Sequence, residues 1–212
     1  MRILSHRGFW LAPAEKNTTA AFERSFVQGF GTETDLRDLD GSLVISHDPP
    51  QRGALLVETV LLQHRKIDPT LPLALNIKAD GLQAMVADLL GRLEVQRAFV
   101  FDMSIPDMLG WHRAGVPVYT RMSDIEPEPL MIDRAAGVWL DAFNSDWWDA
   151  ATISRLLDAG LDVCVVSPDL HKRDYRAAWD KLAGIAGQAD HDRLMICTDF
   201  PQDAKEFFTS AH

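Results

Sequence analysis

The sequence has only two cysteines, Cys164 and Cys197, and they stand far apart. This excludes a disulfide framework and any paired-cysteine zinc spacing, so we expect both thiols to be reduced and structural. Basic residues are also scarce: 21 Lys and Arg stand against 31 Asp and Glu, which gives a net charge of −10. Nucleic-acid affinity comes mainly from basic residues that neutralise phosphates, so no nucleic-acid partner is expected.

Long apolar runs are absent too. No run is long enough to cross a membrane, and no apolar signal segment opens the chain, so we expect a cytoplasmic protein without a membrane span. The composition is otherwise ordinary, with 212 residues of which 47% are hydrophobic and 25% charged. This predicts one globular domain over residues 1–212. The scattered apolar residues do not indicate an oligomeric state.

Short β-rich runs alternate with helix-patterned runs along the whole chain. Asn17 and Thr18 are suited to cap the first helix, and Asp40-Gly41 signals a turn between two strands. The expected strands are 3–7, 32–38, 43–47, 73–78, 98–103, 116–121, 138–143, 162–167 and 194–198. The expected helices are 17–30, 55–63, 82–93, 106–113, 130–135, 148–159, 175–185 and 202–208.

If 43–47 extends the preceding strand, the chain contains eight strand-then-helix units. Such alternation implies parallel strands joined by crossover helices, and eight units predict an α/β fold of the (β/α)8 barrel (TIM barrel) type. An open doubly wound sheet is the alternative. Its dinucleotide-binding version is disfavoured because no Gly-x-Gly-x-x-Gly follows the first strand.

Polar residues gather at the expected carboxyl ends of these strands, where parallel barrels hold their chemistry. Side chains alternate along a strand, so Glu33, Asp35 and Arg37 share one face, as do Asn76 and Lys78. A single polar strand end means little, whereas so many together indicate a site. The set comprises His6, Arg7, Glu33, Asp35, Arg37, His47, Asp48, Asn76, Lys78, Asp102, Arg121, Asp141 and Asp199.

Glu33 and Asp35 repel each other unless a cation lies between them, and their oxygens suit Mg²⁺ or Ca²⁺. The alternative is a structural network in which both pair with Arg37 and Lys78. His6 and His47 are candidates for a general acid and base, although a lone histidine is more often structural. The other histidines are expected to face solvent: His64, His112, His171, His191 and His212.

A set of short motifs then resembles the glycerophosphodiester phosphodiesterases. The order and spacing of the two histidines are similar to that family's, and the combined pattern is specific. Its fold is a (β/α)8 barrel, in agreement with the strand count. The motifs are His6-Arg7-Gly8, Glu15-Lys16-Asn17-Thr18, Ala21-Phe22, Glu33-Thr34-Asp35-Leu36 and Asp40 to Asp48. Two further segments, Asn76-Ile77-Lys78 and Thr198 to Pro201, match the family pattern more weakly.

The resemblance implies roles for individual residues. His6 and His47 would be the catalytic acid and base, and Lys78 would stabilise phosphate charge. Arg7 would contact the phosphate of a small-molecule diester. Glu33 and Asp35 would bind the divalent ion, Mg²⁺ or Ca²⁺. We add Arg121 as a supporting phosphate contact and Trp10 as a residue of the pocket rim.

The sequence departs from the family at two places. Asn76 stands where members usually carry a glutamate as third metal ligand, and its uncharged amide oxygen should bind a cation more weakly. Asp102 and Asp141 are the alternatives for that missing charge. The segment from His47 to Asn76 is also shorter than usual, as in the related phospholipase-type barrels, which weakens the case for glycerol specificity more than for phosphodiester chemistry.

The expected activity is therefore metal-dependent hydrolysis of a glycerophosphodiester or a related diester derived from phospholipids. The attacking group, water or a neighbouring substrate hydroxyl, is left open, as is which histidine is the acid. One alternative is a catalytically silent barrel that binds a phosphate-bearing ligand. Another is a barrel isomerase or aldolase, which would not need two histidines at these strand ends.

Overall fold

A computed structural model describes residues 1–186 and 192–210, so His191 and His212 lie outside the described residues. The chain forms two compact units. One comprises Ser5–Val118, and the other comprises Met1–Leu4 together with Tyr119–His212. The single domain expected for residues 1–212 stays a prediction.

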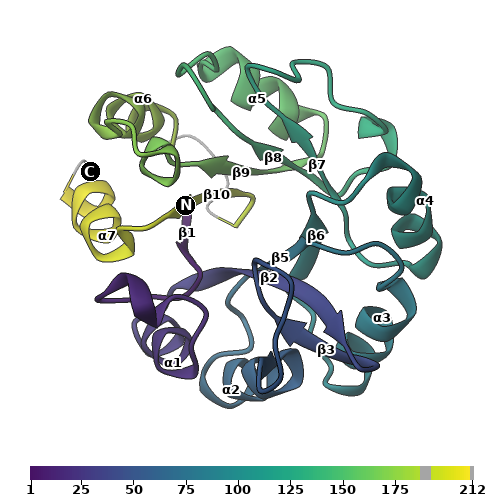
Figure 1. The fold of residues 1–212 in the computed structure, drawn as a ribbon. Coiled ribbons are helices and arrows are strands. Elements are labelled where there is room, and N and C mark those ends of the chain that lie inside the picture. Colours follow the sequence, from purple (N-terminus) through teal and green to yellow (C-terminus); the bar gives the residue numbers. More distant parts are fainter. Residues whose placement is uncertain (187–191, 211–212) are drawn as a thin grey trace. The chain divides into compact units, whose positions relative to one another are not determined.

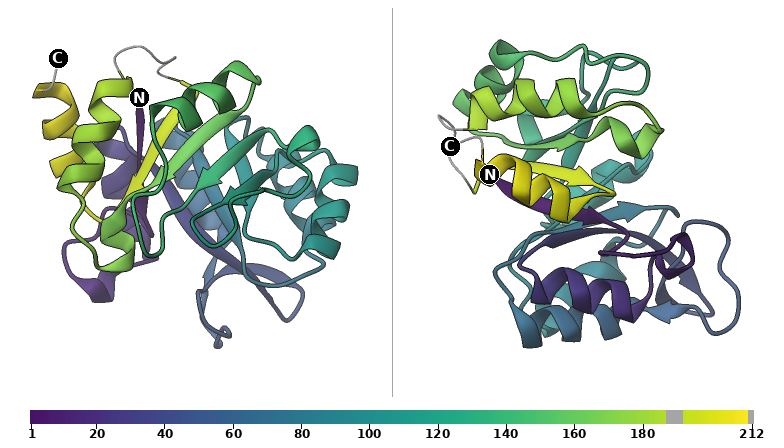
Figure 2. Two further views of the ribbon diagram at one scale, coloured as in Figure 1. Left: turned by 90° about the horizontal axis from the view of Figure 1, so that it is seen from above. Right: turned by 90° about the vertical axis from the view of Figure 1, so that its left-hand side faces the viewer.

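The unit Ser5–Val118 is built around parallel strands with helices on their outer side (Figures 1 and 2). Strand β2 pairs in parallel with β5, and β5 pairs in parallel with β6. The strands are the end of β1 (Arg2–His6), then β2 (Gly31–Leu39), β3 (Ser42–Ile45), β4 (Leu55–Leu56), β5 (Leu73–Ile77) and β6 (Ala98–Phe101). The helices are η1 (Pro13–Glu15), α1 (Thr19–Val27), α2 (Val57–Ile67), α3 (Gln83–Arg92) and α4 (Ile105–Ala114).

Local chemistry explains where these elements begin and turn. The hydroxyl of Thr18 accepts a hydrogen bond from the backbone N–H of Ala21, which caps α1 as expected. Asp40 and Gly41 both have positive φ angles, 49° and 79°, in the turn that joins β2 to the antiparallel β3. Turns of this kind match the twist of the strands they join, so the predicted Asp40-Gly41 turn is confirmed.

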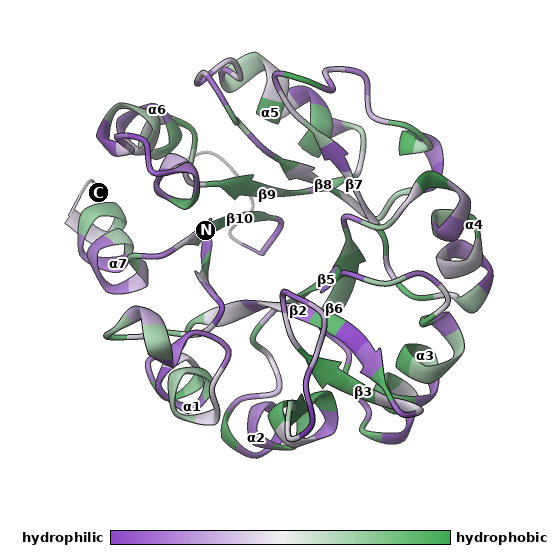
Figure 3. Ribbon diagram, viewed as in Figure 1, coloured by the Kyte–Doolittle hydropathy of each residue, from purple (hydrophilic) through white to green (hydrophobic). Residues whose placement is uncertain are grey.

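The second unit contains four parallel strands in the order β10-β9-β8-β7. Apolar residues on one face of these strands pack with Trp148, Trp179 and Phe208 into one core. Figure 3 shows the hydrophobic character of β9, whose Val163 and Val165 belong to this core. The strands are β7 (Tyr119–Met122), β8 (Gly137–Leu140), β9 (Asp162–Val166) and β10 (Leu194–Thr198). The helices are η2 (Ile132–Arg134), α5 (Ala150–Asp158), η3 (Pro168–His171), α6 (Arg176–Ala186) and α7 (Pro201–Ser210).

The predicted alternation is confirmed, with shifts at a few boundaries. The helix expected at 130–135 is a single 3-10 turn, Ile132–Arg134. The strand expected at 116–121 begins at Tyr119, because Val118 makes only an isolated bridge to Val100. The helix expected at 55–63 begins at Val57, because Leu55 and Leu56 pair with β3 instead. Among the described residues, we find no helix with the length and apolar character needed to cross a membrane.

Candidate active site

Two buried carboxylates on β2 form the centre of the site. The side chains of Glu33 and Asp35 are 2% and 0% exposed, and they share the face that strand alternation predicts. In the parallel pairing of β2 with β5, Asp35 lies opposite Asn76, which is itself buried. Three oxygen-bearing side chains therefore occupy neighbouring positions on adjacent strands.

Each of these three side chains keeps one oxygen atom without a hydrogen-bond partner. Glu33 Oε2, Asp35 Oδ1 and Asn76 Oδ1 are buried and unsatisfied within the described part of the chain. Unsatisfied buried polar atoms are rare in folded proteins, and three of them side by side call for an explanation such as a bound ion. Hard divalent cations prefer such oxygen ligands, so this donor set fits Mg²⁺ or Ca²⁺. No three His, Cys, Asp or Glu side chains of residues 1–186 and 192–210 are grouped so that they could hold a metal, and the third oxygen beside Glu33 and Asp35 is the amide oxygen of Asn76.

Two cations flank Asp35. Arg7 Nε lies 3.0 Å from Asp35 Oδ2, and Lys78 Nζ lies 3.6 Å from Asp35 Oδ1. Lys78 Nζ also lies 4.0 Å from a carboxylate oxygen of Asp102, which places this alternative ligand near the same ammonium group. Arg37, expected as a partner in a structural network, instead donates to the backbone carbonyl of His47 at 3.0 and 3.1 Å.

His6 ends β1 beside Glu33, with its Nε2 atom 3.8 Å from Glu33 Oε2. Burial raises the pKa of Glu33 well above its usual range, and the negative charge of Asp35 raises it further, while Arg7 and Lys78 oppose the shift. A cation bound between the two carboxylates would favour their ionised forms.

The loop after β1 folds tightly because Gly8 leaves room for α1. Its φ is +82°, and a Cβ atom there would lie 2.8 Å from Ala21 Cβ, so any larger residue would clash. The Gly8 N–H donates to the buried hydroxyl of Thr32 at 3.0 Å. Arg7 also has a positive φ of 59°, an uncommon conformation for a side chain of this size. This backbone carries Arg7 to Asp35.

Asn17 contacts this cluster, although the sequence analysis considered it only as a helix cap and as one position of a motif. Its side-chain Nδ2 donates to Asp35 Oδ2 at 3.1 Å, and its Oδ1 accepts from the Thr34 hydroxyl at 2.9 Å. The signal available in the sequence was its place in the Glu15-Lys16-Asn17-Thr18 motif. The pairing with Asp35 could not be read from spacing alone.

His47 follows β3, and the chain brings its backbone close to Asp35, since Ser46 N donates to Asp35 O at 3.1 Å. The His47 side chain is about half exposed, and its Nδ1 lies 3.0 Å from an oxygen of Asp48. The structure therefore brings His6, Arg7, Glu33, Asp35, Asn76 and Lys78 together. The side chain of His47 pairs with Asp48.

Trp10 lies on the first loop, where its indole N–H donates to the backbone carbonyl of His6 at 3.2 Å. The ammonium group of Lys16 sits over the Trp10 ring, 4.4 Å from its centre. Both contacts fix the ring next to the first catalytic candidate. Its role at the pocket rim stays a prediction.

Arg121 and Asp141 belong to the other unit. Arg121 Nε pairs there with Glu126 at 2.9 Å. Asp141 Oδ1 lies 2.6 Å from His171 Nε2, and this hydrogen bond raises the pKa of His171 above its ordinary value. His171 was expected to face solvent, and that expectation is wrong because the ring packs against Phe143 and pairs with Asp141.

The expectation for His64 is wrong as well. It lies on the inner face of α2 and is fully buried, with its ring edge against Phe26. Its Nε2 pairs with the backbone carbonyl of Leu71 at 2.8 Å, and burial lowers the pKa of the imidazole. A buried imidazole that is hard to protonate is a structural residue.

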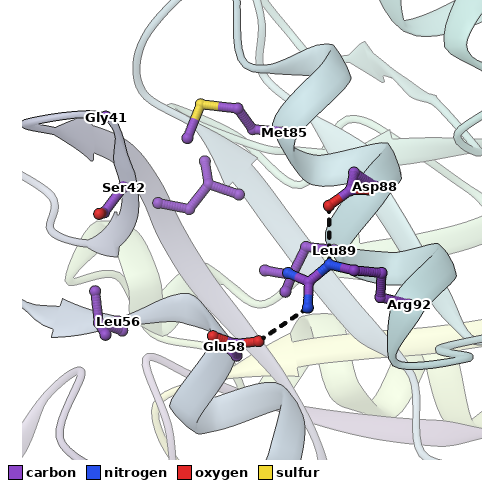
Figure 4. A pocket seen from close by; sticks show the side chains of 9 residues that line it. Gly41, Ser42, Leu56, Glu58, Met85, Asp88, Leu89 and Arg92 are labelled. Atoms are coloured by element: carbon purple, nitrogen blue, oxygen red, sulfur yellow. Dashed lines mark hydrogen bonds and ion pairs between the residues drawn. The ribbon is translucent and has the colours of Figure 1, made fainter.

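A cavity of about 260 Å³ opens elsewhere in the unit Ser5–Val118, between β3, β4 and α3 (Figure 4). Arg92 lies within it and bridges Glu58 at 3.2 Å and Asp88 at 2.9 Å. None of the predicted site residues lines this cavity. It is a surface recess with two ion pairs among its lining residues, and neither Glu33 nor Asp35 borders it.

Comparisons with known proteins define the fold. No protein-family model matches the chain, and no curated protein sequence matches it. Among solved structures, it is similar to a glycerophosphodiester phosphodiesterase from Agrobacterium tumefaciens strain C58, with a TM-score of 0.69, 20% identity and 99% of both chains covered.

Two further structures are similar over most of their length. One is a glycerophosphoryl diester phosphodiesterase from Parabacteroides distasonis, with a TM-score of 0.63 and 13% identity, covering 99% of this chain and 86% of that one. The other is a calcium-dependent phosphoinositol-specific phospholipase C from a Gram-negative Pseudomonas, with a TM-score of 0.62 and 10% identity, covering 95% and 89%.

These likenesses show that the chain has the TIM-barrel fold, so the predicted fold class is confirmed over the doubly wound alternative. Barrels of this type carry many unrelated activities, so the fold alone does not assign one. The chemistry has to be argued from the residues at the site.

Proposed function

We propose that this protein is a metal-dependent phosphoric diester hydrolase of the glycerophosphodiester phosphodiesterase type. One observation carries the proposal: Glu33, Asp35 and Asn76 each hold a buried oxygen without a hydrogen-bond partner, beside His6, Arg7 and Lys78. The sequence motifs and the structural neighbours support the same assignment.

The divalent ion, Mg²⁺ or Ca²⁺, would be held by the free oxygens of Glu33, Asp35 and Asn76. When bound, such an ion neutralises negative charge on a phosphoryl group and orients it. The calcium dependence of the Pseudomonas phospholipase supports Ca²⁺ as a candidate. Because Asn76 is neutral, only Glu33 and Asp35 can contribute formal negative charges to the site. We therefore expect the ion to bind more weakly than it would to three carboxylates.

The remaining residues act on the diester itself. Arg7 and Lys78 supply positive charge that stabilises the nonbridging oxygens as charge builds up in the transition state. One histidine accepts the proton of the attacking hydroxyl as its oxygen bonds to phosphorus. The other donates a proton to the departing alkoxide as the phosphorus–oxygen bond breaks, so a free alcohol leaves. His6 and His47 are proposed for these roles, with Arg121 and Trp10 as substrate contacts.

The substrate class is a glycerophosphodiester or a related phospholipid-derived diester. A phosphorus-NMR screen of several such diesters with Mg²⁺ or Ca²⁺ tests this directly. We expect one or more diester signals to be replaced by a monoester or cyclic phosphate signal, and a chelator to stop the change. Binding of diesters without turnover would instead favour the silent phosphate-binding barrel, for which the Asn76 departure is the supporting observation.

A further inference from the structure

Asn17 contacts the site at three points. Its Nδ2 donates to Asp35 Oδ2 at 3.1 Å, and its Oδ1 accepts from Thr34 Oγ1 at 2.9 Å. Its backbone N–H donates to the carbonyl of Arg7 at 2.9 Å. Thr34 and Asp35 point to opposite faces of β2, so the amide group of Asn17 is held between two successive strand residues.

These contacts make the two oxygens of Asp35 unequal. Oδ2 receives the amide of Asn17 and lies 3.0 Å from Arg7 Nε. Oδ1 is buried without a hydrogen bond in the described part of the chain, with Lys78 Nζ at 3.6 Å. The plane of a carboxylate can rotate about its bond to Cβ, and donors fixed against one oxygen limit that rotation and so fix the direction in which the other oxygen points.

Helix capping does not explain the side chain of Asn17, and a tolerated backbone conformation does not by itself account for its two side-chain hydrogen bonds. Thr18, rather than Asn17, caps α1. Asn17 has a φ of 59°, which asparagine tolerates, but a glycine would suit that backbone equally well. We therefore assign the amide group of Asn17 to the contact with Asp35.

We infer that Asn17 is a positioning residue for Asp35: it fixes Oδ2 so that Oδ1 is presented to the divalent ion. This inference rests on the proposed function for the ion itself. Partners that orient metal ligands in this way typically change metal affinity by about 10–100-fold when they are removed.

Two substitutions distinguish the effect of the Asn17 side-chain amide from the effect of its backbone conformation. Asn17→Gly suits the positive φ and removes both side-chain hydrogen bonds. Asn17→Asp keeps the shape and the acceptor for Thr34, but it places a second carboxylate against Asp35. Glu15→Gln is the matched control in the same loop, because Glu15 holds the loop through Leu11 N and Arg24 rather than through Asp35.

The first measurement is calorimetric titration of the full chain with Mg²⁺ alone and with Ca²⁺ alone. We expect Asn17→Gly to weaken binding about 10-fold or more, while Glu15→Gln stays within about twofold of the wild type. The ion affinity of Asn17→Asp should differ from that of Asn17→Gly, because the extra carboxylate charge of Asn17→Asp acts directly on the ion. Equal losses in Asn17→Gly and Glu15→Gln would mean that Asn17 only shapes the loop, and would overturn the inference.

The second measurement is a crystal structure of Asn17→Gly beside one of the wild type. We expect the Asp35 carboxylate to rotate in the variant, and an unchanged carboxylate would overturn the inference. If the wild type binds neither ion, the metal part of the proposed function fails by itself. The orientation of Asp35 in the variant then still decides whether Asn17 positions it.

Discussion

Replacing Asn76 by glutamate should convert a weak cation site into a stronger one. Asn76 lies opposite Asp35 on the neighbouring strand, and adjacent strands are about 4.8 Å apart. Two carboxylates about 5 Å apart at an effective dielectric constant of about 20 repel by about 3 kcal/mol. Because Arg7 and Lys78 already flank Asp35, we expect a smaller net loss, about 1–2 kcal/mol, in the metal-free variant.

A divalent ion should offset much of that loss. We expect Asn76→Glu to bind Mg²⁺ or Ca²⁺ at least about tenfold more tightly, which corresponds to about 1.4 kcal/mol of additional stabilisation at saturating ion. Calorimetric titration gives the affinities, and thermal unfolding with and without the ion gives the stabilisation. A lower stability of Asn76→Glu without metal, together with a larger stabilisation by the ion, would identify a charge effect.

The control is Asn76→Gln, which has the size of glutamate without its charge. Asn76 is buried, so the added methylene group perturbs packing equally in both variants. If Asn76→Glu and Asn76→Gln bind the ion with the same affinity, position 76 is not a metal ligand. The reading of the three unsatisfied oxygens as a cation site would then be refuted.

His6→Ala and His47→Ala are each expected to lower diester turnover about 100-fold or more while circular dichroism stays unchanged, and near-normal turnover would contradict the assigned role. The charged pair of His171 with Asp141 should add about 1–2 kcal/mol of stability at acidic pH, lost as the pH rises through the raised pKa of His171. Urea unfolding at about pH 5.5 and 8.5 tests this, since Asp141→Asn should abolish the loss. The lowered pKa of His64 acts oppositely, so stability falls as the pH drops below the ordinary histidine value, and His64→Gln should remove that fall.

Much of the fold was predictable because it depends on local patterns. Strand and helix periodicity gave the alternation, and Asp40-Gly41 gave the hairpin turn. Strand alternation also placed Glu33 and Asp35 on one face, and their burial agrees with it. These features require only neighbours in the sequence.

Features that depend on distant partners were missed. The inward position of His64 follows from the packing of α2 against Phe26, and the pairing of His171 with Asp141 joins the end of η3 to the residue that follows β8. The positive φ of Arg7 likewise has no sequence signal, because arginine rarely adopts it. Long-range contacts override local preference at such positions.

The hairpin from β2 to β3 sets where His47 can lie. Leu36 pairs with Ile45 and Leu39 with Ser42, so the short turn fixes how far the returning strand travels. One extra residue in β3 would advance His47 by about 3.4 Å and reverse the side to which it points. Chain length in this hairpin is therefore as constrained as the identity of the histidine, and natural variation in length should be confined to the exposed stretch that follows it.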